Sequence, residues 1–235
     1  VRVFDLADGR LVRTIRMPSG TGNVGKVYAV ALSPDGTFVA AGGTLSSPDE
    51  NLSNWIYLFD RASGALLHRL AHLPSHVLHL AFSSNGHFLA TVLARDGLRV
   101  YGAKHGWAEI ARDLDYGGQS HGVAFAPGSD ARLATTSWDG RVRAHPPLAP
   151  PGGRIPASGR LDPETQSAAP HGLRPHGLAF QPSGAVLAVG YDDTTSVSRL
   201  DADTLRALPS PDTDRLTSGD LSKIAWSPDG SVLIA

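Results

Sequence analysis

The chain has 235 residues, of which 41% are hydrophobic and 18% charged, so it can bury a substantial core. Its 21 basic and 22 acidic side chains give a net charge of -1, which disfavours nucleic acid or an acidic membrane as the partner. Cysteine is absent, which excludes disulfides and thiolate sites; a reducing compartment is allowed, and we expect a cytoplasmic protein.

The first elements along the chain are short strands joined by turns. Residues 1–16 contain two strand-like runs, VRVFD and LVRTIR, and read as part of a repeat unit. The next unit, about 27–71, opens with VYAVALSPDGTFVAAGG, where two apolar runs flank the turn SPDG. Proline presets φ for a turn and glycine accepts positive φ, so this segment predicts a hairpin. A second strand pair, WIYLF and ALLHRL, flanks FDRASG, which completes four antiparallel strands.

This four-strand pattern recurs in units at about 77–115, 121–158 and 175–210, with a partial unit at 221–235. The large residue before each hairpin turn recurs about every 43 to 55 residues, a spacing typical of propeller blades, at Leu32, Phe82, Phe125, Phe180 and Trp226. A single four-stranded sheet buries too little surface, whereas radial stacking buries both faces. The sequence therefore predicts one all-β propeller domain over 1–235, with about five blades' worth of strands.

Two insertions interrupt the repeat. The first, at 44–54, separates the second and third strands of its unit, and the second, at 146–175, is rich in proline and glycine, with one weak strand expected at 154–157. Surface loops of this kind often carry binding residues, and exposed aromatics at turns anchor interfaces. The candidate partner contacts are Ser47, Asp49, Glu50, Asn51, Asn54, Trp138 and Tyr191.

Several motifs resemble the WD40-repeat β-propeller family. The stretch LLHRLAHLPSHVLHLAFSSNG at 66–86 places His72 at the family's Gly-His step, and runs such as LATTSWD place Asp96, Asp139 and Asp193 at the turn between second and third strands. The resemblance implies that these are structural positions, with His72 and Asp96 in a hydrogen-bond network inside a blade. Phe-Asp replaces Trp-Asp in two units and the Gly-His step is missing elsewhere, so complete networks are not expected in most blades.

The family commonly has seven blades, so the resemblance implies a fragment of a larger ring, with closure at five blades as the alternative. A narrower resemblance, carried by GKVYAVALSPDG and GYDDTTSV, is to the propeller modules of multidomain bacterial signalling proteins that carry a caspase-like peptidase or another effector domain elsewhere.

The histidines are the main candidates for chemistry. His68, His72, His76 and His79 are spaced as zinc ligands on a helix would be, but they span two strands and a turn, so no metal site is predicted. His121 and His176 each lie four residues before their unit's phenylalanine, which predicts a position at the mouth of the central channel. No acidic residue recurs beside them, and no nucleophile elbow or phosphate loop is present.

No catalytic residue, cofactor or metal site is therefore predicted. The leading hypothesis is a non-enzymatic interaction scaffold, or a sensory or regulatory module of a larger protein, whose partner is a protein or another domain of the parent chain. The alternative is a propeller enzyme of the hydrolase or lactonase type, which would hold a metal ion in the channel.

Overall fold

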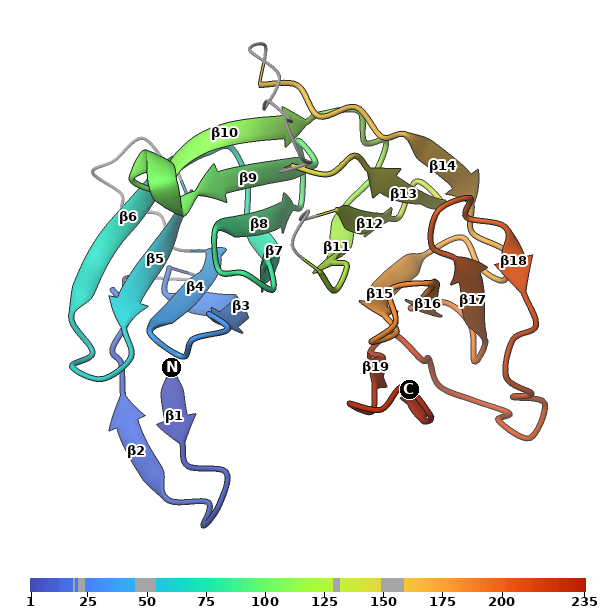
Figure 1. Ribbon diagram of the computed structural model, residues 1–235, viewed down its shortest axis with the longest axis horizontal. Helices are drawn as coiled ribbons and strands as arrows, with labels where there is room; N and C mark the ends of the chain where they lie inside the picture. Colours follow the sequence, from blue (N-terminus) through green and yellow to red (C-terminus); the bar gives the residue numbers. More distant parts are fainter. Residues whose placement is uncertain (19, 21–23, 45–53, 129–131, 149–158) are drawn as a thin grey trace.

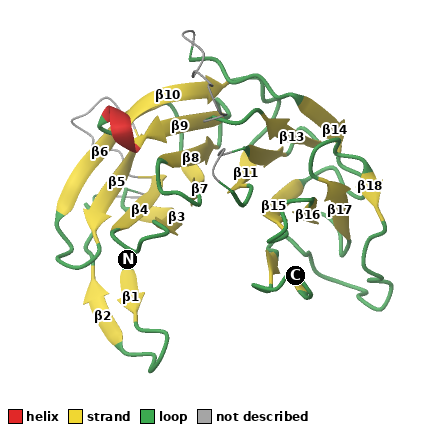
Figure 2. Ribbon diagram, in the orientation of Figure 1, coloured by secondary structure: helices red, strands yellow, loops and turns green. Residues whose placement is uncertain are grey.

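The computed structural model describes the whole chain except residues 19, 21–23, 45–53, 129–131 and 149–158, and the side chains of Ala71 and His72. Apart from one short 3-10 turn at Ala103–His105, the regular structure in this part of the chain consists of β-strands. Figure 2 shows strands and connecting loops along the entire arc. Within the same residues, no helix has the length and apolar character needed to cross a bilayer.

The strands form four complete antiparallel sheets, which we call blades I to IV. Blade I contains β3 (Lys26–Leu32), β4 (Phe38–Thr44), β5 (Asn54–Asp60) and β6 (Leu66–Leu73). Blade II contains β7 (Val77–Phe82), β8 (Phe88–Leu93), β9 (Leu98–Gly102) and β10 (Ala108–Asp113). Blade III contains β11 (Ser120–Phe125), β12 (Leu133–Ser137), β13 (Arg141–His145) and β14 (Thr165–Ala168). Blade IV contains β15 (Pro175–Phe180), β16 (Val186–Tyr191), β17 (Val197–Asp201) and β18 (Ala207–Leu208).

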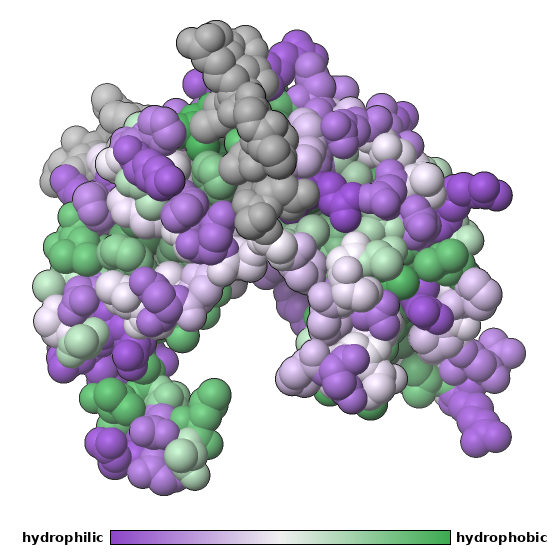
Figure 3. All heavy atoms as spheres, viewed as in Figure 1, coloured by the Kyte–Doolittle hydropathy of each residue, from purple (hydrophilic) through white to green (hydrophobic). Residues whose placement is uncertain are grey.

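Figure 1 shows the blades side by side around an arc, with the first strand of each blade innermost and the fourth outermost. Two hairpins end the arc, one made of β1 (Arg2–Phe4) and β2 (Leu11–Thr14), the other of β19 (Ala225–Trp226) and β20 (Leu233–Ile234). These hairpins are separate two-stranded sheets and do not pair, so the ring is not closed. The five-bladed alternative is therefore wrong for this structure, which shows part of a ring. Figure 3 shows hydrophobic residues on the first hairpin, where Leu6 is fully exposed and Phe4 half exposed.

The hairpin turns have the conformation that their residues predict. Gly36 has a φ of 71° and Gly230 a φ of 71°, which only glycine adopts readily. In the first of these turns, Asp35 Oδ1 accepts hydrogen bonds from the Ser33 hydroxyl at 2.5 Å and the Thr37 amide at 3.0 Å. These local bonds fix the turn and hence the pairing of β3 with β4.

The structure agrees with the predicted position of the first insertion and differs from the predicted end of the blade that holds the second. The strand bounds place the first between the second and third strands of blade I, as predicted, with residues 45–53 outside the described part. The weak strand expected at 154–157 also lies outside it. The fourth strand of blade III is instead β14, so this blade ends at residue 168, beyond the predicted end at 158. The short polar run TQSA of β14 gives little hydrophobic signal.

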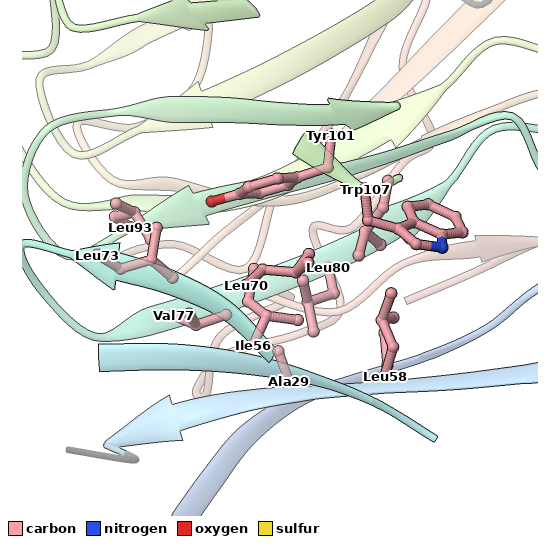
Figure 4. Packing of buried hydrophobic residues seen from close by; sticks show 12 residues of the cluster. Ala29, Ile56, Leu58, Leu70, Leu73, Val77, Leu80, Leu93, Tyr101 and Trp107 are labelled. Atoms are coloured by element: carbon pink, nitrogen blue, oxygen red, sulfur yellow. The ribbon is translucent and has the colours of Figure 1, made fainter. Parts of the chain in front are cut away.

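The core lies between the blades rather than within a single sheet. Between blades I and II, Ile56 and Leu58 face Leu80 and Trp107, as Figure 4 shows. Two further clusters join blades II to III and III to IV, and another joins the first hairpin to blade I. The second and third strands are buried on both faces because each sheet is covered by two neighbours. This confirms the radial stacking that the repeated hairpins predict.

A β-bulge recurs near the start of the innermost strand of all four blades. The register shifts between Val27 and Ala29, between Val77 and His79, and at the corresponding places in blades III and IV. Bulges redirect side chains and bend a strand. Here they bring His79 Nδ1 to 3.1 Å from the Val123 amide, which donates a hydrogen bond across the boundary between blades II and III.

Gly122 supplies the first test of this packing. A Cβ at Gly122 would lie 2.4 Å from the His176 carbonyl oxygen and 2.5 Å from the Thr136 hydroxyl oxygen. Overpacking of this kind costs about 2 to 3 kcal/mol, so we expect Gly122→Ala to lower the free energy of unfolding by that amount in urea denaturation. Gly9→Ala is the control, because a Cβ at Gly9 would have no neighbouring atom within 4 Å, and its cost should come only from positive φ. Equal losses for the two variants would contradict this account.

Candidate functional site on the loop face

In blades II to IV, one face of the arc carries the connections between blades and the turns between second and third strands. We call it the loop face; in blades II to IV its residues are 94–97, 114–119, 138–140, 169–174 and 192–196. Neighbouring segments of this face are tied by hydrogen bonds. The Gly117 amide donates to Asp139 Oδ2 at 3.2 Å, and the Leu173 amide donates to Asp193 Oδ2 at 2.8 Å. The face is therefore built from fixed loops.

Three sequence-predicted residues meet in a ring stack beside this face. His121 stacks on Trp138 with centroids 4.3 Å apart and on His176 with centroids 4.4 Å apart. The Arg174 guanidinium lies 5.1 Å from the Trp138 ring centroid, which is a cation–π distance. Both histidines occupy the bulge of an innermost strand, and Ser120 pairs with Ser137, which brings the following Trp138 alongside. The stack spans the boundary between blades III and IV.

The imidazoles of the stack are neutral near pH 7. Burial lowers the pKa of His121 to about 4, and the neighbouring His176 adds to the effect. Burial also lowers the pKa of His176 to about 4, with a further contribution from Lys223. His121 Nε2, His176 Nδ1 and Trp138 Nε1 are buried without a hydrogen-bond partner. In the described part of the chain, no three His, Asp or Glu residues are grouped to hold a metal ion.

The other candidate contacts are placed differently. Tyr191 is fully buried and its hydroxyl lies 2.5 Å from Ser198 Oγ, so the expectation of an exposed anchor is wrong for this residue. The physical reason is the loop above it, since a Cβ at Gly172 would lie 2.7 Å from the Tyr191 ring. Asn54 begins β5 and is only 4% exposed. The remaining candidates lie outside the described residues: Ser47, Asp49, Glu50 and Asn51.

The predicted structural aspartates occupy the turns between second and third strands. Asp139 accepts hydrogen bonds from both terminal nitrogens of Arg143, at 2.5 and 3.2 Å. Burial raises the pKa of Asp139, but the bonds and charge of Arg143 outweigh it, so the pKa is lowered. Asp96 has a left-handed φ of 67°, and its carbonyl accepts from Arg99 at 2.5 Å. The backbone of His72 lies in β6, but its side chain is outside the described part, so its place in a hydrogen-bond network with Asp96 stays a prediction.

The boundary between blades II and III contains a buried polar network that the sequence does not predict. His145 Nε2 lies 3.3 Å from both Thr135 Oγ1 and Tyr116 OH, and His145 Nδ1 lies 4.0 Å from Asp113 Oδ2. This order of acid, imidazole and hydroxyl has the form of a catalytic triad. Thr135 and His145 are fully buried, however, so a substrate has no access to the hydroxyl. No short motif joins these residues, which come from three strands and a loop.

Antiparallel four-stranded sheets stacked around an arc define the chain as a β-propeller protein built from repeats. Residues 9–55 and 64–98 match the family model described as WD40: WD domain, G-beta repeat. These two segments are therefore similar to WD40 repeats. Each matched segment runs from the outer strand of one sheet into the inner strands of the next. No curated protein matches the chain.

Proposed function

We propose that this chain is a non-enzymatic scaffold that binds a protein partner through the loop face, around Trp138, Leu173 and Arg174. WD40 repeats generally mediate protein–protein interactions, and this family is mostly non-enzymatic. The single observation that carries the proposal is the ring stack, in which Trp138 contacts both the His121 ring and the Arg174 guanidinium. Next to Arg174 in the chain, Leu173 is 79% exposed.

These residue types suit the centre of an interface. Tryptophan and arginine are enriched among residues that dominate binding energy. Stacking on His121 fixes the Trp138 ring, and the hydrogen bond from the Leu173 amide to Asp193 fixes the loop that carries Leu173 and Arg174. Side chains ordered before binding lose less conformational entropy when the partner arrives. The arrangement therefore supports an interface of fixed shape.

The enzyme alternative has weaker support. A metal ion in the channel would need His121 and His176 as ligands, but their rings are stacked with an interplanar angle of 27°. Imidazole lone pairs lie in the ring plane, so rings stacked in this way do not converge on one ion. Metal analysis of the purified chain and of a His121→Ala/His176→Ala variant tests this alternative; bound metal that disappears in the variant would support it.

The interface itself is tested by affinity capture with the full chain as bait, in lysate from cells that produce the parent protein. We expect Trp138→Ala and Leu173→Asp each to reduce the amount of captured partner at least tenfold in quantitative mass spectrometry. Leu67→Asp is the matched control, because Leu67 is 45% exposed on the outer strand β6, away from the loop face. Capture unchanged by Trp138→Ala and Leu173→Asp would contradict the proposed interface.

The identity of the partner, the size of the parent ring and the cellular location stay predictions. We propose that the partner is a separate protein or another domain of the parent chain, as in the bacterial signalling proteins that the sequence resembles. A seven-bladed parent ring and a cytoplasmic location are likewise predictions, the second supported by a sequence without cysteine.

A further inference from the structure

A cavity of about 630 Å³ lies at the outer edge of the arc, between blades II and III. We call it the edge cavity; its described lining consists of Arg112, Asp113, Leu114, Asp115 and Arg160. It forms where the end of β10 runs beside residues 159–161. There Arg112 donates its amide to the Gly159 carbonyl at 2.7 Å and accepts from the Leu161 amide at 2.7 Å. Backbone hydrogen bonds thus fix two sides of the cavity.

The lining contains a buried carboxylate, one oxygen of which has no hydrogen-bond partner. Asp113 is only 2% exposed, and its Oδ1 accepts a hydrogen bond from the Asp115 amide at 2.9 Å. Its Oδ2 is buried and has no hydrogen-bond partner. Burial raises the pKa of Asp113; the hydrogen bond from the Asp115 amide and the charge of Arg143 oppose this shift, and the nearby carboxylates of Asp115 and Asp162 add to it. A buried carboxylate oxygen without a hydrogen-bond partner lowers the stability of the fold. A ligand that donates a hydrogen bond to Asp113 Oδ2 would remove this cost.

The neighbouring imidazole does not neutralise Asp113. His145 Nδ1 lies 3.2 Å from the Leu161 carbonyl, which can only accept, so this nitrogen carries the proton and donates it there. Burial lowers the pKa of His145 to about 3, so the ring is neutral at pH 7. At 4.0 Å, Asp113 Oδ2 is beyond hydrogen-bond distance from Nδ1.

The arginines around the cavity already have carboxylate partners. Arg112 pairs with Glu109 at 2.7 Å, and Arg160 pairs with Asp162 at 2.5 Å. Arg143, the other nearby guanidinium, pairs with Asp139 at 2.5 Å. By contrast, neither Asp113 Oδ2 nor the Asp115 carboxylate has a donor among the residues that the structure describes. The charge left uncompensated at the cavity is therefore negative.

We propose that the edge cavity binds the basic side chain, arginine or lysine, of a protein partner. A guanidinium or ammonium group would donate to Asp113 Oδ2 and pair with Asp115, and charge-assisted bonds of this kind are among the stronger ones in proteins. An anion would meet two carboxylates and only arginines that are already paired. The choice of a protein partner rests on the proposed function, but the residues are distinct from the Trp138 stack.

The test uses the full chain and two capped tripeptides, acetyl-Gly-Arg-Gly-amide and the same peptide with citrulline, which is uncharged, in place of arginine. Inorganic phosphate is the anionic probe. In amide NMR spectra at pH 7, we expect the arginine peptide to shift signals of residues 112–115 with saturation. We expect affinity at least tenfold lower for the citrulline peptide, and no shift of these signals with phosphate.

Variants assign the binding to the two carboxylates. Asp113→Asn keeps an acceptor for the Asp115 amide but removes the charge, and we expect at least a tenfold loss of affinity for the arginine peptide. Asp115→Asn, at an exposed position, should cost at least threefold and leave the fold intact. Asp212→Asn is the matched control, because Asp212 is also exposed and accepts a bond from a backbone amide two residues on.

Equal affinity for the citrulline peptide, binding of phosphate at these residues, or full affinity in Asp115→Asn would each overturn the proposal. Asp115→Asn and the citrulline comparison decide the matter even if Asp113→Asn does not fold. Trp138→Ala should leave the titration unchanged, so failure at the edge cavity and failure of the loop-face interface give different results.

Discussion

Lowering the pH from 7 to 5 is expected to remove about 4 kcal/mol from the free energy of unfolding through His145 and His79. The main cause is two imidazoles that are buried in the native chain; the partly buried His121 and His176, whose pKa values burial also lowers to about 4, add to the loss. Burial lowers the pKa of His145 to about 3 and that of His79 to about 4, whereas a histidine in an unfolded chain titrates near 6.5. Below pH 6.5 the unfolded chain takes up protons that the native chain does not, so stability falls until the native pKa values are reached near pH 4. At pH 5 each of the two imidazoles lowers the free energy of unfolding by about 2 kcal/mol relative to its value at pH 7.

The measurement is urea denaturation at pH 7, 6 and 5. His145→Gln should make the loss of stability between pH 7 and 5 smaller by about 2 kcal/mol, whatever its effect at pH 7, because glutamine does not titrate. His87→Gln is the control, since His87 is exposed, and it should leave the dependence unchanged. Asp35 and Asp229 do not interfere, because hydrogen bonds from neighbouring hydroxyls lower the pKa of each, so their contribution is lost only at more acidic pH. An unaltered pH dependence in His145→Gln would refute this explanation.

The fold was predictable from sequence where local chemistry decides the structure. The turn at residues 33–36 needs a proline, an acceptor and a glycine at positive φ, and all three are visible in the sequence. The repeat also places His121 and His176 at one offset, from which their proximity in adjacent blades follows. The sequence does not reveal the outer strand β14 of blade III, because this strand is short and polar and lies beyond a long insertion.

The candidate site was less predictable because burial depends on neighbouring blades. Trp138 and Tyr191 both lie beside turns between second and third strands, yet Tyr191 is fully buried under the loop that contains Gly172, whereas Trp138 is half-buried. Asp113 and His145 are far apart in sequence and meet only because residues 159–161 run back beside β10. No periodicity or motif records such a contact.

The intrablade networks show the same limit. In blade IV, His171 Nδ1 lies 2.8 Å from Ser198 Oγ, which also contacts the Tyr191 hydroxyl. Blade III instead uses Arg143, which lies 4.3 Å from the Tyr116 ring centroid and pairs with Asp139. Both sets tie the loop between blades to the third strand, with different residues. The sequence predicts that the family's complete hydrogen-bond network is missing from most blades, but it does not predict which residues replace it.

The Arg143–Asp139 pair is therefore expected to carry much of the stability of blade III. The Arg143 side chain is 3% exposed and that of Asp139 is 11% exposed. Removing one partner of a buried ion pair leaves an uncompensated charge, which costs about 3 to 5 kcal/mol. We expect Asp139→Asn to lower the free energy of unfolding by about 3 kcal/mol, because Arg143 keeps its contacts with Tyr116 and the Asp115 carbonyl.

A double variant separates the charge from the packing. Asp139→Asn combined with Arg143→Met removes both charges and keeps an apolar side chain over Tyr116, so it should be more stable in urea than Asp139→Asn alone. Asp8→Asn is the control, because Asp8 pairs with Arg10 at 3.7 Å in an exposed turn. Removing this exposed ion pair should lower the free energy of unfolding less than Asp139→Asn does. If Asp139→Asn were no more harmful than Asp8→Asn, the network would not stabilise the blade. If the double variant were less stable than Asp139→Asn alone, the side chain of Arg143 would act through its other contacts and not through the buried charge.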